Sequence, residues 1–314
     1  MKLRAAVFGS GWGAHAARAL ARHPSVELIA LVGRGSDRTH ALGAELGAPV
    51  RSELGLYVDL AVVAVSERVH LELVEPLVER RIALLITHPV CPRAEEVERL
   101  ANAADRAGVV IRTDYTFRPR PELAALRPRE DRGALLRLSI EAPGRWLPIA
   151  LDVAVCLAGP VHIVHANPAY PRKLAERARR APHAFVPSMM LTHVSGTVST
   201  IVPVPHAPPA EPVRVCASYE RGRVTASLPR GGAAWLALRA GGEVEARELV
   251  APSADTLDAS VHARGMEELV ACFVDTLEDG ARALASLAEE AHLRRVWAAL
   301  WRATGERAGA DVGL

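Results

Sequence analysis

A glycine-rich turn near the start of the chain separates a short apolar run from an amphipathic segment. Residues 4–8 (RAAVF) favour a buried strand, and small apolar residues after the turn recur with the spacing of one helix face. Between them, the residues from Gly9 to Ala14 follow the pattern GxGxxA, a variant of the dinucleotide-binding motif. An ordinary tight turn is the alternative, but the strand–turn–helix context is the one that the motif requires.

Each position of this motif has a physical purpose. The first glycine permits the tight bend, the second lets the backbone approach a pyrophosphate, and the small last residue lets the helix pack on the strand. The helix N-terminus then presents N–H groups and a partial positive charge to the phosphates. We therefore expect the pyrophosphate of a dinucleotide to be bound by Gly9, Ser10, Gly11, Trp12 and Gly13.

Strand and helix patterns alternate through the first 113 residues. Further strands are expected at residues 26–32, 59–65, 82–86 and 109–113, and helices at residues 36–46, 69–80 and 93–107. Strands that alternate with helices of this length form βαβ units and a parallel sheet. The fold class is therefore α/β, with an N-terminal Rossmann domain, a doubly wound parallel sheet, over residues 1–117.

The pattern changes after about Tyr115. A segment rich in proline and arginine, residues 118–128, favours a linker or a short helix. Short strand patterns follow at residues 135–141, 161–165, 196–204, 213–219, 223–228 and 235–239, with helices at 149–157, 266–277 and 286–304. We expect an α+β domain with a mostly antiparallel open sheet over residues 118–285, followed by a C-terminal helix in residues 286–314.

The end of the second strand distinguishes between the two nicotinamide dinucleotides. Enzymes that use NAD usually place an acidic residue there to accept from the ribose 2′-hydroxyl. This chain instead has the sequence GRGSDR, in which basic and hydroxyl groups suit a 2′-phosphate. The alternative is that the arginines are solvated and the serine only caps a helix. We expect NADP(H), bound here by Arg34, Gly35, Ser36 and Arg38.

Several motifs resemble the glucose–fructose oxidoreductase/inositol dehydrogenase (Gfo/Idh/MocA) superfamily. They are Ala64-Val65-Ser66 with His70, Ile86-Thr87-His88-Pro89, and the ending Phe273-Val274-Asp275 through Trp297 to Thr304-Gly305. The resemblance implies that Ser66 lies at the nicotinamide ribose and that His88 and Pro89, at the end of the fifth strand, also bind the cofactor. It also implies that the final helix packs on the nucleotide domain and that the protein is a homodimer. In this family the catalytic acid–base residue, usually a lysine, lies at the end of the fifth strand.

The sequence departs from this family at that acid–base residue. Where the family has Glu-Lys-Pro, the chain has Thr87-His88-Pro89, and this resembles the thiazolinyl imide reductases of siderophore and other nonribosomal peptide biosynthesis. The resemblance implies reduction, with NADPH, of a thiazoline or oxazoline ring held on a carrier protein. Histidine suits proton delivery because its ordinary pKa of about 6.5 keeps a protonated fraction near neutral pH. Either His88 or Tyr115 is the expected proton donor, and Asp152 is a candidate for the substrate site.

Two other functions remain open on the sequence alone. One is a dehydrogenase of a sugar, a polyol or a free imine, and the other is a nucleotide-binding accessory protein without catalysis. The basic run within residues 169–182 is either a solvated surface or a docking patch for an acidic carrier domain.

Composition excludes several other classes of partner. The formal net charge of +2 gives no general attraction to nucleic acid or membrane, and no apolar run is long enough to span a bilayer. The four cysteines are scattered, so we expect no metal site and a reducing, cytoplasmic location.

Overall fold

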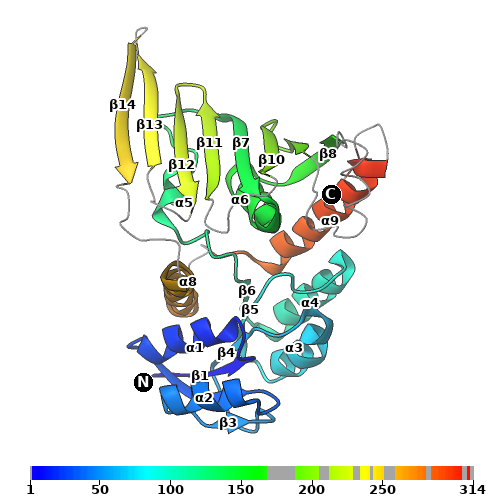
Figure 1. The fold of residues 1–314 in the computed structure, drawn as a ribbon. Helices are drawn as coiled ribbons and strands as arrows, with labels where there is room; N and C mark the ends of the chain where they lie inside the picture. Colours follow the sequence, from blue (N-terminus) through cyan, green and yellow to red (C-terminus); the bar gives the residue numbers. More distant parts are fainter. Residues whose placement is uncertain are drawn as a thin grey trace. The chain divides into compact units, whose positions relative to one another are not determined.

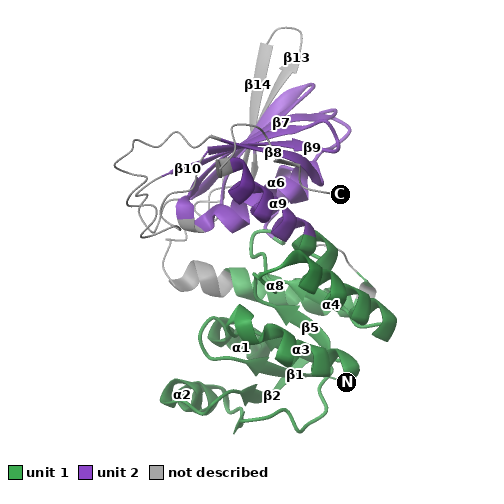
Figure 2. Cartoon of the chain, turned by 90° about the vertical axis from the view of Figure 1, so that its right-hand side faces the viewer, with its two compact units in different colours: residues 1–119, 262–291 green, residues 120–261, 292–314 purple. Residues whose placement is uncertain are grey.

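Two compact units make up the protein (Figure 2). Unit 1 comprises Met1–Pro119 and His262–Ala291, and unit 2 comprises Arg120–Val261 and His292–Leu314. The structure is a computed structural model that describes residues 2–167, 188–204, 212–228, 234–240, 243–250, 259–280, 284–305 and 310–311. The basic run at 169–182 lies outside these residues.

Unit 1 is built on a six-stranded parallel sheet with the strand order β3-β2-β1-β4-β5-β6 (Figure 1). This is the doubly wound Rossmann arrangement that the alternating pattern predicted. The strands are β1 (Leu3–Phe8), β2 (Val26–Val32), β3 (Val50–Arg51), β4 (Leu60–Val63), β5 (Ala83–Ile86) and β6 (Ile111–Thr113). The helices of the unit are α1 (Gly13–Arg22), α2 (Asp37–Leu46), α3 (His70–Glu79), α4 (Ala94–Ala107) and α8 (Ala259–Asp279).

Both faces of this sheet are buried, because successive side chains of a strand point to opposite sides. In β1, Ala5 and Val7 belong to the core cluster that contains α1 and α8 residues. Ala6 and Phe8 belong to the opposite cluster, which contains α3 and α4 residues. This explains why the strands of unit 1 are continuous apolar runs rather than alternating ones.

The boundary expected near residue 285 differs from the observed one. The sequence prediction placed residues 262–285 with the second domain, but the compact units assign them to unit 1. The reason is packing: Leu269 and Phe273 of α8 are fully buried in the cluster that includes Leu20 of α1. The C-terminal helix α9 (Leu287–Gly305) also differs, since it belongs to unit 1 only as far as Ala291.

Unit 2 contains a nine-stranded sheet in the order β14-β13-β12-β11-β7-β10-β9-β8-β15. Its strand pairs are antiparallel except for β7 with β10, as expected for a mostly antiparallel sheet. The strands are β7 (Leu135–Pro143), β8 (Val161–Asn167), β9 (Ser188–His193), β10 (Val198–Val204), β11 (Val213–Tyr219), β12 (Gly222–Leu228), β13 (Ala234–Ala240), β14 (Glu243–Val250) and β15 (Ala310–Asp311). The apolar helix α6 (Leu147–Ala158) packs on β7 and β10, and the short helix α5 (Pro121–Ala125) packs on β12.

No helix among the described residues has the length and apolar character that crossing a membrane requires. All four cysteines lie in the described part of the chain, and none forms a disulfide.

Candidate active site

The three glycines of the turn after β1 have separate structural roles. Gly9 has a φ of +94°, and a Cβ there would lie 2.2 Å from the carbonyl oxygen of Ala64, so only glycine fits. A Cβ on Gly13 would lie 3.1 Å from Cγ1 of Val7, where α1 packs closely on the strand. A Cβ on Gly11, in contrast, would meet nothing within 4 Å. The open space at Gly11, at the N-terminus of α1, fits the close approach of a pyrophosphate.

The segment after β2 lies against this turn. Ser36 caps α2, because its Oγ accepts from the N–H of Thr39 at 3.3 Å. The Thr39 hydroxyl in turn donates to Oγ of Ser10 at 2.9 Å, which joins the two loops. Arg34 and Arg38 are exposed, and Nη2 of Arg38 lies 3.5 Å from the carbonyl oxygen of Gly11. The side chain of Arg38 therefore lies beside the glycine turn, and Arg34 is exposed just after β2.

His88 lies in the loop after β5, at the carboxyl edge of the sheet where open α/β folds bind ligands. Its Nδ1 lies 2.8 Å from Oδ1 of Asp114, and its backbone N–H donates to the same oxygen at 2.7 Å. The His88 side chain is 22% exposed, whereas that of Asp114 is 3% exposed. The pair therefore has a buried carboxylate behind a ring that reaches solvent.

Asp114 also contacts the glycine turn. Its second carboxylate oxygen, Oδ2, accepts from the indole Nε1–H of Trp12 at 2.8 Å. One carboxylate thus joins Trp12, in the expected pyrophosphate turn, to His88, the expected proton donor. All three residues belong to unit 1.

Tyr115 supports the His88 ring from one side. The two rings are stacked, with centroids 4.6 Å apart and planes 18° from parallel. Tyr115 is fully buried, and its hydroxyl donates to Oε2 of Glu290 at 2.6 Å. Oε1 of Glu290 accepts from the N–H of Val90 at 3.3 Å, so the same buried carboxylate also holds the chain just after His88.

The loop after β4 is joined to the loop after β5 by His70. The His70 ring is buried, with Nδ1 at 2.9 Å from the carbonyl oxygen of Val90 and Nε2 at 3.1 Å from that of Val65. Ser66 is exposed at the start of a short 3-10 helix, Glu67–Val69, and Pro89 is half-buried. Both residues thus lie in loops at the carboxyl edge of the sheet.

Asp152 lies in unit 2, on α6, and is fully buried. Within the part of the chain that the structure describes, no group of three or more His, Cys, Asp or Glu residues could hold a metal ion.

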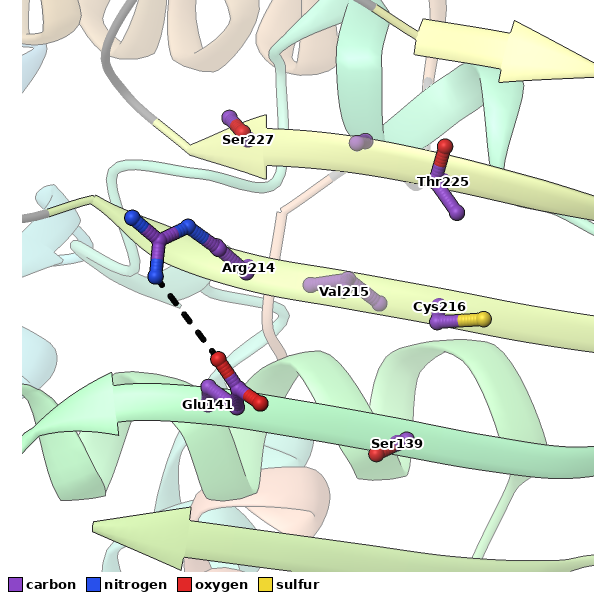
Figure 3. Close-up of a pocket in the computed structure, with 8 residues that line it drawn as sticks. Ser139, Glu141, Arg214, Val215, Cys216, Thr225 and Ser227 are labelled. Carbon is purple, nitrogen blue, oxygen red and sulfur yellow. Dashed lines mark ion pairs between the residues drawn. The ribbon is translucent and has the colours of Figure 1, made fainter. Parts of the chain in front are cut away.

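A cavity of about 320 Å³ lies on the sheet of unit 2 (Figure 3). It is lined by residues of β7, β11 and β12, and Nη1 of Arg214 lies 3.7 Å from Oε2 of Glu141 across it. None of the site residues expected from the sequence lines this cavity, so it does not alter the position of the candidate active site.

Asp114 and Glu290 were not predicted from the sequence as site residues. Asp114 directly follows β6, and the carboxyl ends of parallel strands meet at one edge, so its place beside His88 could have been inferred. Glu290 is 175 residues from Tyr115, and no spacing in the sequence indicates that pair.

These features are those of a dinucleotide-binding Rossmann domain: a doubly wound parallel sheet, a glycine turn open to a pyrophosphate, and the His88–Asp114 pair beside it. Residues 3–115 match the model of the Gfo/Idh/MocA oxidoreductase family with an NAD-binding Rossmann fold, so the N-terminal domain is similar to that family.

One curated relative is 32% identical over 133 residues and is provisionally assigned as the oxidoreductase subunit of a UDP-kanosamine synthase in Amycolatopsis mediterranei. The match covers 40% of this chain and 37% of that protein, so the chain spans little more than a third of its relative's length.

Solved structures share the whole fold at low sequence identity. A levoglucosan dehydrogenase in complex with NADH and levoglucosan has a TM-score of 0.83 at 13% identity, with all of both chains covered. A myo-inositol dehydrogenase from Corynebacterium glutamicum has a TM-score of 0.78 at 18% identity, again over all of both chains. A provisionally assigned NADPH-dependent oxidoreductase from Desulfitobacterium hafniense has a TM-score of 0.81 at 12% identity, covering 99% of this chain and 98% of that one.

Proposed function

We propose that the protein is an NADP(H)-dependent reductase of a cyclic C=N bond. Its substrate is a thiazoline or oxazoline ring held on a carrier protein of a nonribosomal peptide synthetase, and its product is the saturated ring. The observation that carries this proposal is the imidazole of His88, which is held by the buried Asp114 and partly exposed beside the glycine turn.

Reduction of a C=N bond adds a hydride to carbon and a proton to nitrogen, and the reduced dinucleotide supplies the hydride when it is bound. Because Asp114 is acceptor-only as a carboxylate, Nδ1 of His88 is its N–H donor. The other ring nitrogen, Nε2, therefore carries the transferable proton in the imidazolium form. The negative charge of Asp114 stabilises that form, as in other histidine–aspartate pairs.

His88 is a better proton donor than Tyr115 on two grounds. Tyr115 is fully buried, and its hydroxyl proton is already directed at Glu290. An ordinary tyrosine also has a pKa near 10, which makes it the weaker acid at neutral pH. We assign Tyr115 to support of the His88 ring.

The segment after β2 supports the proposed phosphate form of the cofactor. Arg34 and Arg38 are exposed there, and the side chain of Arg38 lies at the carbonyl of Gly11. Ser36 is already hydrogen-bonded, because its Oγ accepts from the N–H of Thr39 and lies 2.9 Å from the Thr39 hydroxyl. The two guanidinium groups suit a 2′-phosphate better than a ribose hydroxyl.

The test is oxidation of NADPH with synthetic thiazoline thioesters, both free and loaded on a carrier protein. We expect turnover with the thiazolines and none with sugars or polyols, and conversion of the ring is checked by mass spectrometry. Binding of NADPH without turnover of any substrate would support an accessory role and contradict the proposal.

A second candidate is oxidation of a secondary alcohol in a sugar or cyclitol. The same His88–Asp114 pair favours it, because a neutral imidazole backed by a carboxylate accepts a proton from an alcohol as well. The similar proteins named as levoglucosan and myo-inositol dehydrogenases also favour it. Reduction of NADP⁺ or NAD⁺ by a panel of sugars and cyclitols, without thiazoline turnover, would identify this function.

We also propose a cytoplasmic homodimer that associates through the open face of the unit 2 sheet. Met190 of β9 and Val202 of β10 are 41% and 38% exposed there. Light scattering of the protein, compared with a Met190→Glu variant, tests this: a monomer in both samples would contradict it.

A further inference from the structure

We infer that Trp12 is a positioning residue for the acid–base pair, in addition to its place in the glycine turn. Its Nε1–H donates to Oδ2 of Asp114 at 2.8 Å, while Oδ1 of the same carboxylate accepts from the His88 backbone at 2.7 Å and faces its Nδ1 at 2.8 Å. The inference rests on the proposed function for its kinetic consequence, but its structural part does not.

The indole is not required by the dinucleotide motif. The position of Trp12 is unrestricted in the pattern GxGxxA, because a pyrophosphate is bound there by backbone N–H groups. The side chain of Trp12 instead uses its single donor on a carboxylate that is 3% exposed. A buried carboxylate is costly unless its oxygens accept hydrogen bonds, so this donor stabilises Asp114 where it stands.

The arrangement fixes the rotation of the Asp114 carboxylate. With Oδ2 held by Trp12, Oδ1 faces His88, and the imidazole is kept in the tautomer with its proton on Nδ1. Without the indole donor, Oδ2 must accept from water instead, either after the carboxylate rotates or after water enters the site. Oδ1 then faces Nδ1 less consistently, and the Nδ1–H tautomer is stabilised less. Trp12 therefore couples the position of the glycine turn to the orientation of the proton donor.

The decisive measurement is ¹⁵N NMR of histidine-labelled protein without substrate or cofactor. His88 is identified by the signal that disappears in His88→Gln. We expect the unmodified protein to show His88 in the Nδ1–H tautomer, and Trp12→Phe to show a mixture with the Nε2–H tautomer. Asp114→Asn is the reference for loss of the carboxylate, and Trp301→Phe, a 41% exposed tryptophan, is the matched control and keeps the unmodified spectrum.

The kinetic measurement is made with the thiazoline substrate proposed above. We expect Trp12→Phe to lower kcat about tenfold, the order expected for one hydrogen bond to a charged group, with a smaller change in KM for NADPH and a shifted pH profile. A protein without thiazoline turnover would contradict the proposed function but leave the NMR result to decide this inference. An unchanged tautomer in Trp12→Phe would overturn the inference even if thiazoline is reduced.

Hydrogen exchange of the indole N–H decides the case in which Trp12→Phe does not fold. In the unmodified protein, the Nε1–H of Trp12 should exchange more slowly than that of Trp301, because it is bonded to a buried acceptor. Equal exchange rates would overturn the inference.

Discussion

The hydroxyl of Tyr115 and the carboxylate of Glu290 form a buried hydrogen bond of 2.6 Å between residues that are 175 positions apart in sequence. Because Glu290 also accepts from the N–H of Val90, it holds both the ring that stacks on His88 and the loop that carries His88. The first turn of α9 therefore contributes to the candidate active site through position rather than through contact with a substrate.

Replacement of Tyr115 by phenylalanine separates support from proton transfer. Tyr115→Phe keeps the stacked ring but removes the hydroxyl, which leaves the buried Glu290 with one donor fewer. We expect a loss of about 1–3 kcal/mol in the free energy of unfolding, and less than about a tenfold loss of turnover. Urea unfolding and NADPH oxidation measure the two effects. A loss of turnover as large as that of a His88 variant would make Tyr115 the proton donor instead.

Replacement of His88 by glutamine removes the proposed proton donor while keeping a polar side chain. We expect turnover to fall about 10²–10⁴-fold, the usual contribution of general acid catalysis, with little change in NADPH affinity. The matched control is His162→Gln, because His162 is exposed on β8 of unit 2. Full activity in His88→Gln would exclude His88 from the chemistry.

The glycine turn offers two alanine variants with opposite expected effects. Gly9→Ala places a methyl group 2.2 Å from a carbonyl oxygen at a φ of +94°, so the protein should lose at least about 1–2 kcal/mol of stability. Gly11→Ala meets nothing within 4 Å and should keep its stability. It should nevertheless lose about tenfold or more in NADPH affinity, because the methyl group occupies the space of the pyrophosphate. Thermal melting and calorimetric titration distinguish them; wild-type affinity in a folded Gly11→Ala would place the cofactor elsewhere.

Charge reversal after β2 tests the choice of cofactor. Arg34→Asp puts a carboxylate at the strand tip, where it repels a 2′-phosphate and accepts from a ribose hydroxyl. We expect the ratio of kcat/KM for NADPH to that for NADH to fall about 100-fold, which corresponds to about 2.8 kcal/mol because each tenfold change is 1.4 kcal/mol. Arg127→Asp, at an exposed arginine of unit 2, is the control and should leave the ratio unchanged. An unchanged ratio in Arg34→Asp would show that Arg34 does not bind the phosphate.

The stability of unit 2 should fall in mild acid because of His292. Its Nε2 accepts from the N–H of Val161 at 2.8 Å, which requires an unprotonated nitrogen. Burial, together with the charges of Arg295 and His193, lowers the pKa of His292 from 6.5 to about 4. The neutral ring therefore stabilises the fold above pH 6.5, and this contribution is lost as the pH falls toward 4.

The expected loss is up to about 3 kcal/mol, from 1.36 kcal/mol per pKa unit. His292→Gln keeps an acceptor for the N–H of Val161 but cannot be protonated. The difference between the two proteins in the free energy of unfolding should therefore change across this pH range. Urea unfolding at pH 7.5, 5.5 and 4.5 measures it. A difference in stability between the two proteins that stays constant with pH would contradict the prediction.

The parallel sheet was predictable because burial on both faces leaves a strong pattern. The strand expected at residues 26–32 has those bounds in the structure, and the Rossmann strand order is confirmed. The strands β9 (SMMLTH) and β14 (EVEARELV) were missed. The first has an apolar run of only three residues, Met189 to Leu191, and the second alternates with charged residues, so neither has the longer apolar run that marks a buried strand.

The site was predictable only in part. His88 was found because it replaces a lysine in a motif with a fixed position in the chain. Asp114 was not found, although its position directly after the last strand of the parallel sheet places it at the same edge as His88. Glu290 could not be found, since only the folded chain brings α9 to Tyr115. A motif identifies a single residue, whereas a hydrogen-bonded pair of distant residues is identified from the tertiary structure.

Unit 1 is built from two separate segments of the chain, which are synthesised at different times. Residues Met1–Pro119 are synthesised long before His262–Ala291. Leu269, Phe273 and Leu284 of the later segment belong to the core cluster that also contains α1 residues. The nascent Rossmann sheet therefore lacks the α8 part of this core cluster during translation of the intervening 142 residues, Arg120–Val261, and exposes the apolar surface that α8 covers. Newly made chains stalled in this interval should bind chaperones, and full-length chains should not.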